Sequence, residues 1–242
     1  MRLMTSVKLA ALAAVAALAT SVSADEQAVR ATLATVFPQT PIEGVTETPS
    51  AGLFEATVDG RIYYVTGDGR YILGGPLVDT RSRVNLTAAR LEQVNAIAWK
   101  SLPLDLAIKR VKGAGTRRIA IFEDPDCPYC KVLEKTLTEI DDVTIYVLLY
   151  PIASLHPQAV ERSKAIWCAK DRGRAWDEAL HRGVVPTEVA TCETPIAKLA
   201  AFAQQHRITG TPTIFLSDGR RVVGSVPKAE LEQQMLRAAK AN

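Results

Sequence analysis

The chain has 242 residues, of which 29 are basic and 26 acidic, and its formal charge is +3. This small charge excludes the strongly basic surface that nucleic-acid binding requires, so we expect no nucleic-acid partner. The length exceeds the common size of one domain, about 100–150 residues, which favours two domains.

Residues 1–24 have the pattern of a secretory signal peptide. Arg2 and Lys8 form a basic start, and an uncharged run rich in alanine and leucine follows from Leu9 to Leu18. Residues 22–24 then form a small-residue cleavage site. The alternative is an uncleaved anchor, but the run is shorter than the roughly 20 residues of a membrane span. Cleavage leaves 218 residues (242 − 24) and a charge of +1 (27 − 26).

The next segment has strand-like alternation and turn signals. Asp59-Gly60 between two runs rich in β-forming residues predicts a hairpin. We expect a small β-meander domain over 25–84, which has little core of its own and needs a partner surface. Its predicted elements are a helix over 25–36 and strands over 53–58, 61–66 and 70–73.

A linker helix is predicted between the two domains, within residues 85–104. Thr87 can cap a helix that begins at Ala88, runs to about Ser101 and presents apolar residues on one side. Pro103 ends the helical pattern.

Beyond the linker, apolar runs alternate with amphipathic segments. A strand–helix–strand unit, inserted helices, a β-hairpin and a closing helix follow in thioredoxin-fold order. The fold class is therefore α+β, with a thioredoxin-fold catalytic domain over 105–242. The predicted strands are 119–122, 143–149, 213–216 and 221–224, and the predicted helices are 131–137, 157–168, 174–181, 194–206 and 227–239.

The most informative motif is Cys127-Pro128-Tyr129-Cys130, between a buried strand and an amphipathic helix. Cys127 is expected at the N-terminus of the helix, where the helix dipole favours a thiolate. Cys130, one turn later, can attack Cys127 and release a bound substrate. This spacing indicates a centre for dithiol–disulfide exchange.

The four cysteines allow three pairings. The close spacing of Cys127 and Cys130 favours that pair and leaves Cys168 with Cys192, which we expect to be a structural disulfide in an exported protein. A four-cysteine zinc site is a weaker alternative, because Cys168 and Cys192 are not a second close pair. We predict no metal and no cofactor.

Gly210-Thr211-Pro212-Thr213 opens the C-terminal hairpin. In a thioredoxin fold, this proline is cis and lies against the cysteine turn, where Thr211 can pair with an extended substrate. A trans proline at the start of an edge strand is the alternative.

Other polar residues near the motif are assigned more ordinary roles. Glu123, Asp124 and Asp126 flank it, and one of them could relay a proton, although solvated or capping roles are favoured. The three histidines, His156, His181 and His206, show no ligand spacing and are assigned to the surface or to packing.

The chain resembles the DsbC/DsbG family of periplasmic thiol:disulfide interchange proteins. The resemblance covers nearly the whole mature chain and is closest to the DsbC branch. It is carried by Phe122 to Cys130, Ala165-Ile166-Trp167-Cys168-Ala169-Lys170-Asp171, Gly210-Thr211-Pro212 and Tyr64-Val65-Thr66-Gly67-Asp68-Gly69.

The resemblance implies a V-shaped periplasmic homodimer joined through cystatin-like N-terminal domains, with chaperone-like binding of misfolded or mis-oxidised exported proteins. A DsbD-like membrane thiol reductant would keep the centre reduced. Residue by residue, it implies Cys127 as nucleophile, Cys130 as resolving thiol, Thr211 and Pro212 as the substrate-binding element, and Cys168 with Cys192 as the structural disulfide.

The dipeptide between the cysteines is a departure. Pro128-Tyr129, which tunes the redox potential, is typical of the DsbG branch, whereas Gly-Tyr is commoner in DsbC. Isomerisation, DsbG-like reduction of oxidised single cysteines, oxidation and a redox-independent holdase function therefore remain alternatives. Isomerisation is favoured, and a monomeric oxidase would not need residues 25–84.

Overall fold

The computed structural model describes residues 24–187 and 191–240. The predicted signal peptide lies outside this part of the chain, apart from Ala24. The chain forms two compact units, one ending at Gly74 and the other beginning at Gly75. The predicted first domain, 25–84, extends past this boundary.

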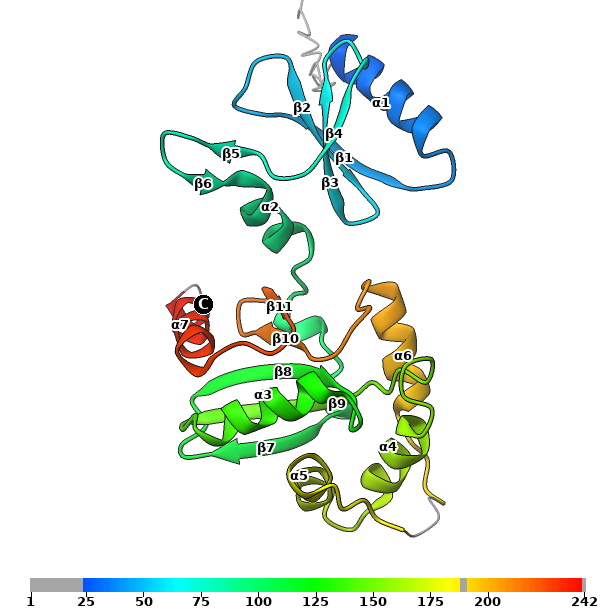
Figure 1. The fold of residues 1–242 in the computed structure, drawn as a ribbon, viewed down its shortest axis with the longest axis vertical. Helices are drawn as coiled ribbons and strands as arrows, with labels where there is room; N and C mark the ends of the chain where they lie inside the picture. Colours follow the sequence, from blue (N-terminus) through cyan, green and yellow to red (C-terminus); the bar gives the residue numbers. More distant parts are fainter. Residues whose placement is uncertain (1–23, 188–190, 241–242) are drawn as a thin grey trace, which may run out of the picture. The chain divides into compact units, whose positions relative to one another are not determined.

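The first unit consists of one helix and a four-stranded antiparallel meander in the order β1-β2-β3-β4 (Figure 1). Val29 and Leu33, one helical turn apart, are fully buried and pack with Phe54 and Val65 of the sheet. The elements are α1 (Ala24–Val36), β1 (Ile42–Glu47), β2 (Leu53–Val58), β3 (Arg61–Thr66) and β4 (Ile72–Gly74).

The sequence analysis did not predict β1, although it predicted β2 and β3 with their observed ends. Only Val45 of β1 is buried, and the register with β2 shifts between Ile42 and Gly44. A polar edge strand with such an irregularity lacks the alternation that identifies a strand.

The turn before β4 requires glycine at position 69. Gly69 has φ +69°, a conformation that side chains disfavour, and its carbonyl accepts a hydrogen bond from Thr32 Oγ1 at 3.0 Å. A Cβ atom at this position would collide with the Thr32 hydroxyl and lie 3.1 Å from the Ala28 carbonyl oxygen. The glycine therefore lets the turn approach α1.

We expect Gly69→Ala to destabilise this unit more than Gly52→Ala. Gly52 has φ +73° but open space around its Cα, so its substitution isolates the backbone strain, about 1–2 kcal/mol. Gly69→Ala adds steric overlap to this strain, which should lower the free energy of unfolding by about 1–3 kcal/mol more. Urea denaturation of the full chain measures both, and equal losses of stability would contradict the packing role.

The second unit is built on a five-stranded sheet in the order β11-β10-β8-β9-β7, in which only β8 and β9 are parallel. Its strands are β7 (Ile108–Lys112), β8 (Arg117–Glu123), β9 (Val143–Leu149), β10 (Thr213–Leu216) and β11 (Arg221–Val223). Its helices are α3 (Pro128–Thr138), α4 (Ala159–Cys168), α5 (Arg172–Arg182), α6 (Ile196–Gln205) and α7 (Lys228–Lys240).

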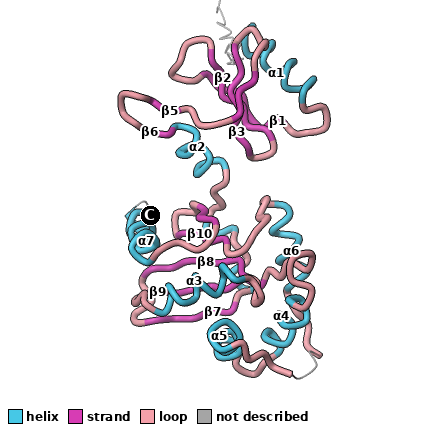
Figure 2. Tube along the Cα trace, in the orientation of Figure 1, coloured by secondary structure: helices cyan, strands magenta, loops and turns pink. Residues whose placement is uncertain are grey.

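The central strands are almost continuous apolar runs, as expected for a sheet covered on both faces. Figure 2 shows α3 crossing the sheet over β8 and β9. Leu133 and Leu137 of α3 are buried in the core with Ile121 and Trp176. Within the described residues, no helix combines the length and the apolar character that are needed to cross a membrane.

The segment that joins the meander to this sheet differs from the predicted linker helix. It contains β5 (Val78–Asp79), β6 (Val84–Asn85), α2 (Leu86–Val94), and the short 3₁₀ turns η1 (Trp99–Ser101) and η2 (Leu104–Leu106).

Asn85, not Thr87, caps α2: its side chain accepts from Ala88 N at 3.0 Å, while the Thr87 hydroxyl accepts from Leu77 N. The helix ends at Val94 rather than near Ser101. Beyond it, Ile97 N donates to the Gly219 carbonyl oxygen, and this hydrogen bond replaces a further helical turn.

Candidate active site

Cys127 is the N-cap residue of α3, directly after the turn that follows β8. Its carbonyl oxygen accepts from Lys131 N at 3.2 Å, and Pro128 occupies the first turn, where a missing N–H group costs little. Cys127 is 4% exposed, whereas Tyr129 is 65% exposed beside it. The end of the helix thus presents a nearly covered sulfur next to an accessible aromatic ring.

The second element of the site comes from the start of β10. The Thr211–Pro212 peptide bond is cis. Cys127 Sγ lies 3.3 Å from the Thr211 carbonyl oxygen, although the two residues are 84 positions apart. The predicted site residues Cys127, Cys130, Thr211 and Pro212 therefore lie together.

The surroundings of Cys127 favour its thiolate. They lower its pKa to about 5, first because the Cys130 thiol donates a hydrogen bond to the thiolate, against the opposing effect of burial. The Thr211 side chain and the backbone N–H groups of Cys130 and Tyr129 add further donors. The contact with the Thr211 carbonyl favours the neutral thiol, but the donors outweigh it.

Cys130 has the opposite character. It is fully buried, and burial raises its pKa far above the ordinary value of a thiol. Its hydrogen bond to Cys127 and the charge of Glu123 act in the same direction. Both cysteines are free thiols in this structure. The pair thus combines an easily ionised sulfur with one that holds its proton.

Asp124 holds the turn between β8 and α3. It is fully buried, and its carboxylate accepts from Asp126 N and Ile152 N, both at 2.8 Å, and lies 2.9 Å from His156 Nδ1. The sequence analysis assigned His156 to the surface or to packing and did not foresee this contact. The Asp126 carboxylate forms an ion pair with Arg162.

Glu123 is not solvated, contrary to the favoured prediction. The predicted strand ended at Phe122, but β8 continues through Glu123, which shares a face with Ile121 and is fully buried. No N–H group of the described residues donates to either of its carboxylate oxygens, and its hydrogen-bonding neighbour is the carboxyl group of Glu134.

Cys168 and Cys192 form a disulfide at the end of α4. Nearby, Trp167 Nε1 donates to the Glu193 carbonyl oxygen at 3.2 Å. Closure of a loop with a sequence separation of 24 stabilises the fold by about 3.5 kcal/mol on the chain-entropy model. This disulfide belongs to the helical insertion, whereas the free thiols belong to the turn before α3.

Two family models match successive parts of the chain. Residues 20–88 match the disulfide bond isomerase protein N-terminal domain, and residues 104–239 match the thioredoxin-like domain. A probable thiol:disulfide interchange protein DsbC of Bordetella avium is 43% identical over 194 residues, which cover 80% of this chain and 69% of that protein.

The chain belongs to the DsbC family. The thiol:disulfide interchange protein DsbC of Escherichia coli is 30% identical over 87% of both chains. The crystal structure of a disulfide interchange protein from Neisseria gonorrhoeae, 38% identical, covers 57% of this chain and 98% of its own, with a TM-score of 0.55. The predicted family and the α+β class with a thioredoxin-like domain are confirmed.

Proposed function

We propose that this member of the DsbC family isomerises or reduces wrong disulfides in exported proteins. The contrast between Cys127, which ionises readily, and Cys130, which retains its proton, carries the proposal. The Cys127 thiolate attacks one sulfur of a substrate disulfide, forms a mixed disulfide and releases a substrate thiolate. A substrate thiol then attacks the mixed disulfide and completes isomerisation, or Cys130 attacks it and leaves the enzyme oxidised.

The substrate is proposed to lie along the cis-proline element. The Thr211 backbone, next to Cys127, can pair with an extended chain. Two exposed apolar side chains adjoin this region and suit an unfolded client: Tyr129, within the cysteine motif, is 65% exposed, and Val223, which pairs with Thr213, is 68% exposed. This surface supports chaperone-like binding as part of the same function.

We assign the parts of the chain as follows: 1–24 as signal peptide, 25–84 as dimerisation domain, 85–104 as linker and 105–242 as catalytic domain. The match of residues 20–88 to the isomerase N-terminal domain supports a homodimer. We place the mature protein in the periplasm. A DsbD-like membrane thiol reductant is the proposed electron donor.

One observation favours a second candidate, DsbG-like reduction of oxidised single cysteines. The two residues between the cysteines, Pro128 and Tyr129, form the dipeptide that is typical of the DsbG branch, and residues at these positions tune the redox potential of the centre. Since 30 mV corresponds to about 1.4 kcal/mol for this couple, a small change in thiolate stability would shift the balance between isomerisation and reduction.

Refolding of a scrambled multi-disulfide protein by the reduced full chain tests the proposal. We expect native disulfides to form faster than with an equal concentration of a free dithiol. A parallel assay with a client that carries one sulfenic acid measures the second candidate. No acceleration in either assay would contradict an exchange function.

A further inference from the structure

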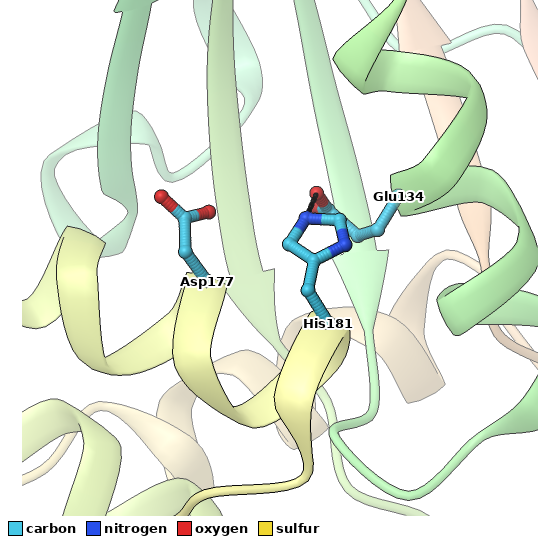
Figure 3. A group of neighbouring side chains, drawn as sticks. All are labelled: Glu134, Asp177 and His181. Atoms are coloured by element: carbon cyan, nitrogen blue, oxygen red, sulfur yellow. Dashed lines mark ion pairs between the residues drawn. The ribbon is translucent and has the colours of Figure 1, made fainter.

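A cluster of charged side chains lies where α3 contacts α5 (Figure 3). Glu134 of α3 is fully buried, and Asp177 and His181 of α5 place their donor atoms close enough to it to hold a metal ion. Arg110, however, lies 2.7 Å from Glu134 and 2.7 Å from Asp177, so its positive charge already compensates both carboxylates. We interpret the group as an ion-pair cluster.

Tyr150, a half-buried residue directly after β9, connects two other parts of the catalytic domain. Its N–H group donates to the carbonyl oxygen of Glu123, the last residue of β8, at 2.7 Å. Its hydroxyl donates to the Ile208 carbonyl oxygen at 3.1 Å, 58 positions along the chain. Its ring packs edge-on against Phe122, with the ring centroids 6.1 Å apart. One residue thus joins the strand before the cysteine turn to the loop before the cis proline.

The loop over 207–212, between α6 and β10, carries the cis proline. At its beginning, Ile208 is 2% exposed, and its N–H group donates to the Ala203 carbonyl oxygen at 2.8 Å. At its end, Thr213 Oγ1 donates to the Gly210 carbonyl oxygen at 2.7 Å, and Thr213 belongs to the sheet. Both ends of the loop are therefore fixed, and the tyrosine hydroxyl is a side-chain anchor at the first of them.

This anchor acts on the position of the loop more than on the charge of the nucleophile. Burial raises the pKa of Tyr150, so the hydroxyl is neutral and can donate. The thiolate of Cys127 is stabilised first by the thiol of Cys130. Loss of the hydroxyl would instead release Ile208, three residues before Thr211, whose carbonyl oxygen lies 3.3 Å from Cys127 Sγ.

We propose that Tyr150 is a positioning residue for client binding, an inference that rests on the proposed function. Through Ile208, its hydroxyl holds Thr211 where the backbone of an extended client can pair with it beside Cys127. A small disulfide reaches the sulfur without such pairing and gains nothing from the anchor. Tyr150 therefore favours the reaction of unfolded protein chains over that of small disulfides.

Two disulfides with the same leaving group test this role by stopped flow. One joins an unstructured peptide to an aromatic thiol that absorbs when released, and the other is the symmetrical disulfide of that aromatic thiol. In Tyr150→Phe, we expect the second-order rate constant with the peptide to fall about fivefold, the usual effect of one hydrogen bond. The rate constant with the small disulfide should stay within about twofold.

The dependence of the rate on peptide concentration identifies the step that the hydroxyl assists. In Tyr150→Phe, the half-saturating peptide concentration should rise while the rate at saturation remains near that of the wild type, because binding rather than sulfur attack is weakened. Since the substitution removes one oxygen atom and keeps the ring against Phe122, the fold should be retained.

Tyr146→Phe is the matched control. Tyr146 is a half-buried tyrosine on β9, and its ring packs edge-on against Trp99 and lies 5.8 Å from Lys109 Nζ. These contacts do not involve its hydroxyl, so the variant should behave as wild type with both disulfides.

Equal rate constants with the peptide in wild type and Tyr150→Phe would overturn the inference. Equal losses with the peptide and the small disulfide would also overturn it, because the hydroxyl would then act on the thiol or on the fold as a whole. A wild-type chain that reacts with neither disulfide would instead refute the proposed function.

Discussion

Replacement of Cys127 by serine should abolish disulfide exchange. We expect isomerase activity to fall by at least about 1,000-fold, because a serine hydroxyl does not ionise near neutral pH and cannot form a disulfide. Refolding of a scrambled multi-disulfide protein measures the loss. Since Ser is close to Cys in size, the fold should be retained.

The matched variant is Cys130→Ser. It keeps the attacking thiol but removes the resolving one, so mixed disulfides with the client should accumulate and be visible on non-reducing gels. Suppression of client aggregation should persist in both variants, because the exposed apolar surface is unchanged. Exchange activity in Cys127→Ser near the wild-type level would show that another group is the nucleophile.

Replacement of Arg110 by alanine should cause a large loss of stability. Arg110 is the cation that pairs with the fully buried Glu134, and its own side chain is only 15% exposed. Removal of one partner of a buried ion pair typically costs 3–5 kcal/mol, because the remaining charge is left uncompensated. We expect a loss of about this size in urea denaturation at pH 7.

The pH dependence of this loss has a defined sign. Without Arg110, protonation of the buried carboxylates in the folded state removes their uncompensated charge. The difference in the free energy of unfolding between variant and wild type should therefore become smaller as the pH falls. Lys109→Ala is the control: Lys109 is the exposed neighbour on β7, and surface substitutions usually stay within about 0.5 kcal/mol. A loss below about 1 kcal/mol for Arg110→Ala would contradict the role assigned to the ion pair.

The part of the fold that carries the thiols was predictable from local pattern. The apolar run of β8, the turn residues before Cys127 and the amphipathic spacing of α3 each indicate the observed element, and the cis proline follows from the order of motifs. Strand β7 was missed. Only Ile108 of its residues is buried, and three of its five residues are basic, which hides the strand alternation.

The charged groups beneath the thiols could not be predicted in the same way. Glu123, Glu134 and Arg110 come from three separate elements, and their contact depends on tertiary packing rather than on sequence spacing. A carboxylate next to a reactive turn is usually solvated, which is why that role was favoured for Glu123. A strand extended by one residue instead places it in the core.

The rate of alkylation of Cys127 against pH tests the central claim most directly. With a pKa of about 5 for Cys127, half of the thiol is ionised near pH 5. The thiolate fraction decreases at lower pH and is constant above about pH 7. We therefore predict that the alkylation rate of the reduced protein follows this curve. A rate that is still rising between pH 8 and about 9, as for a free thiol of pKa near 8.5, would contradict the account.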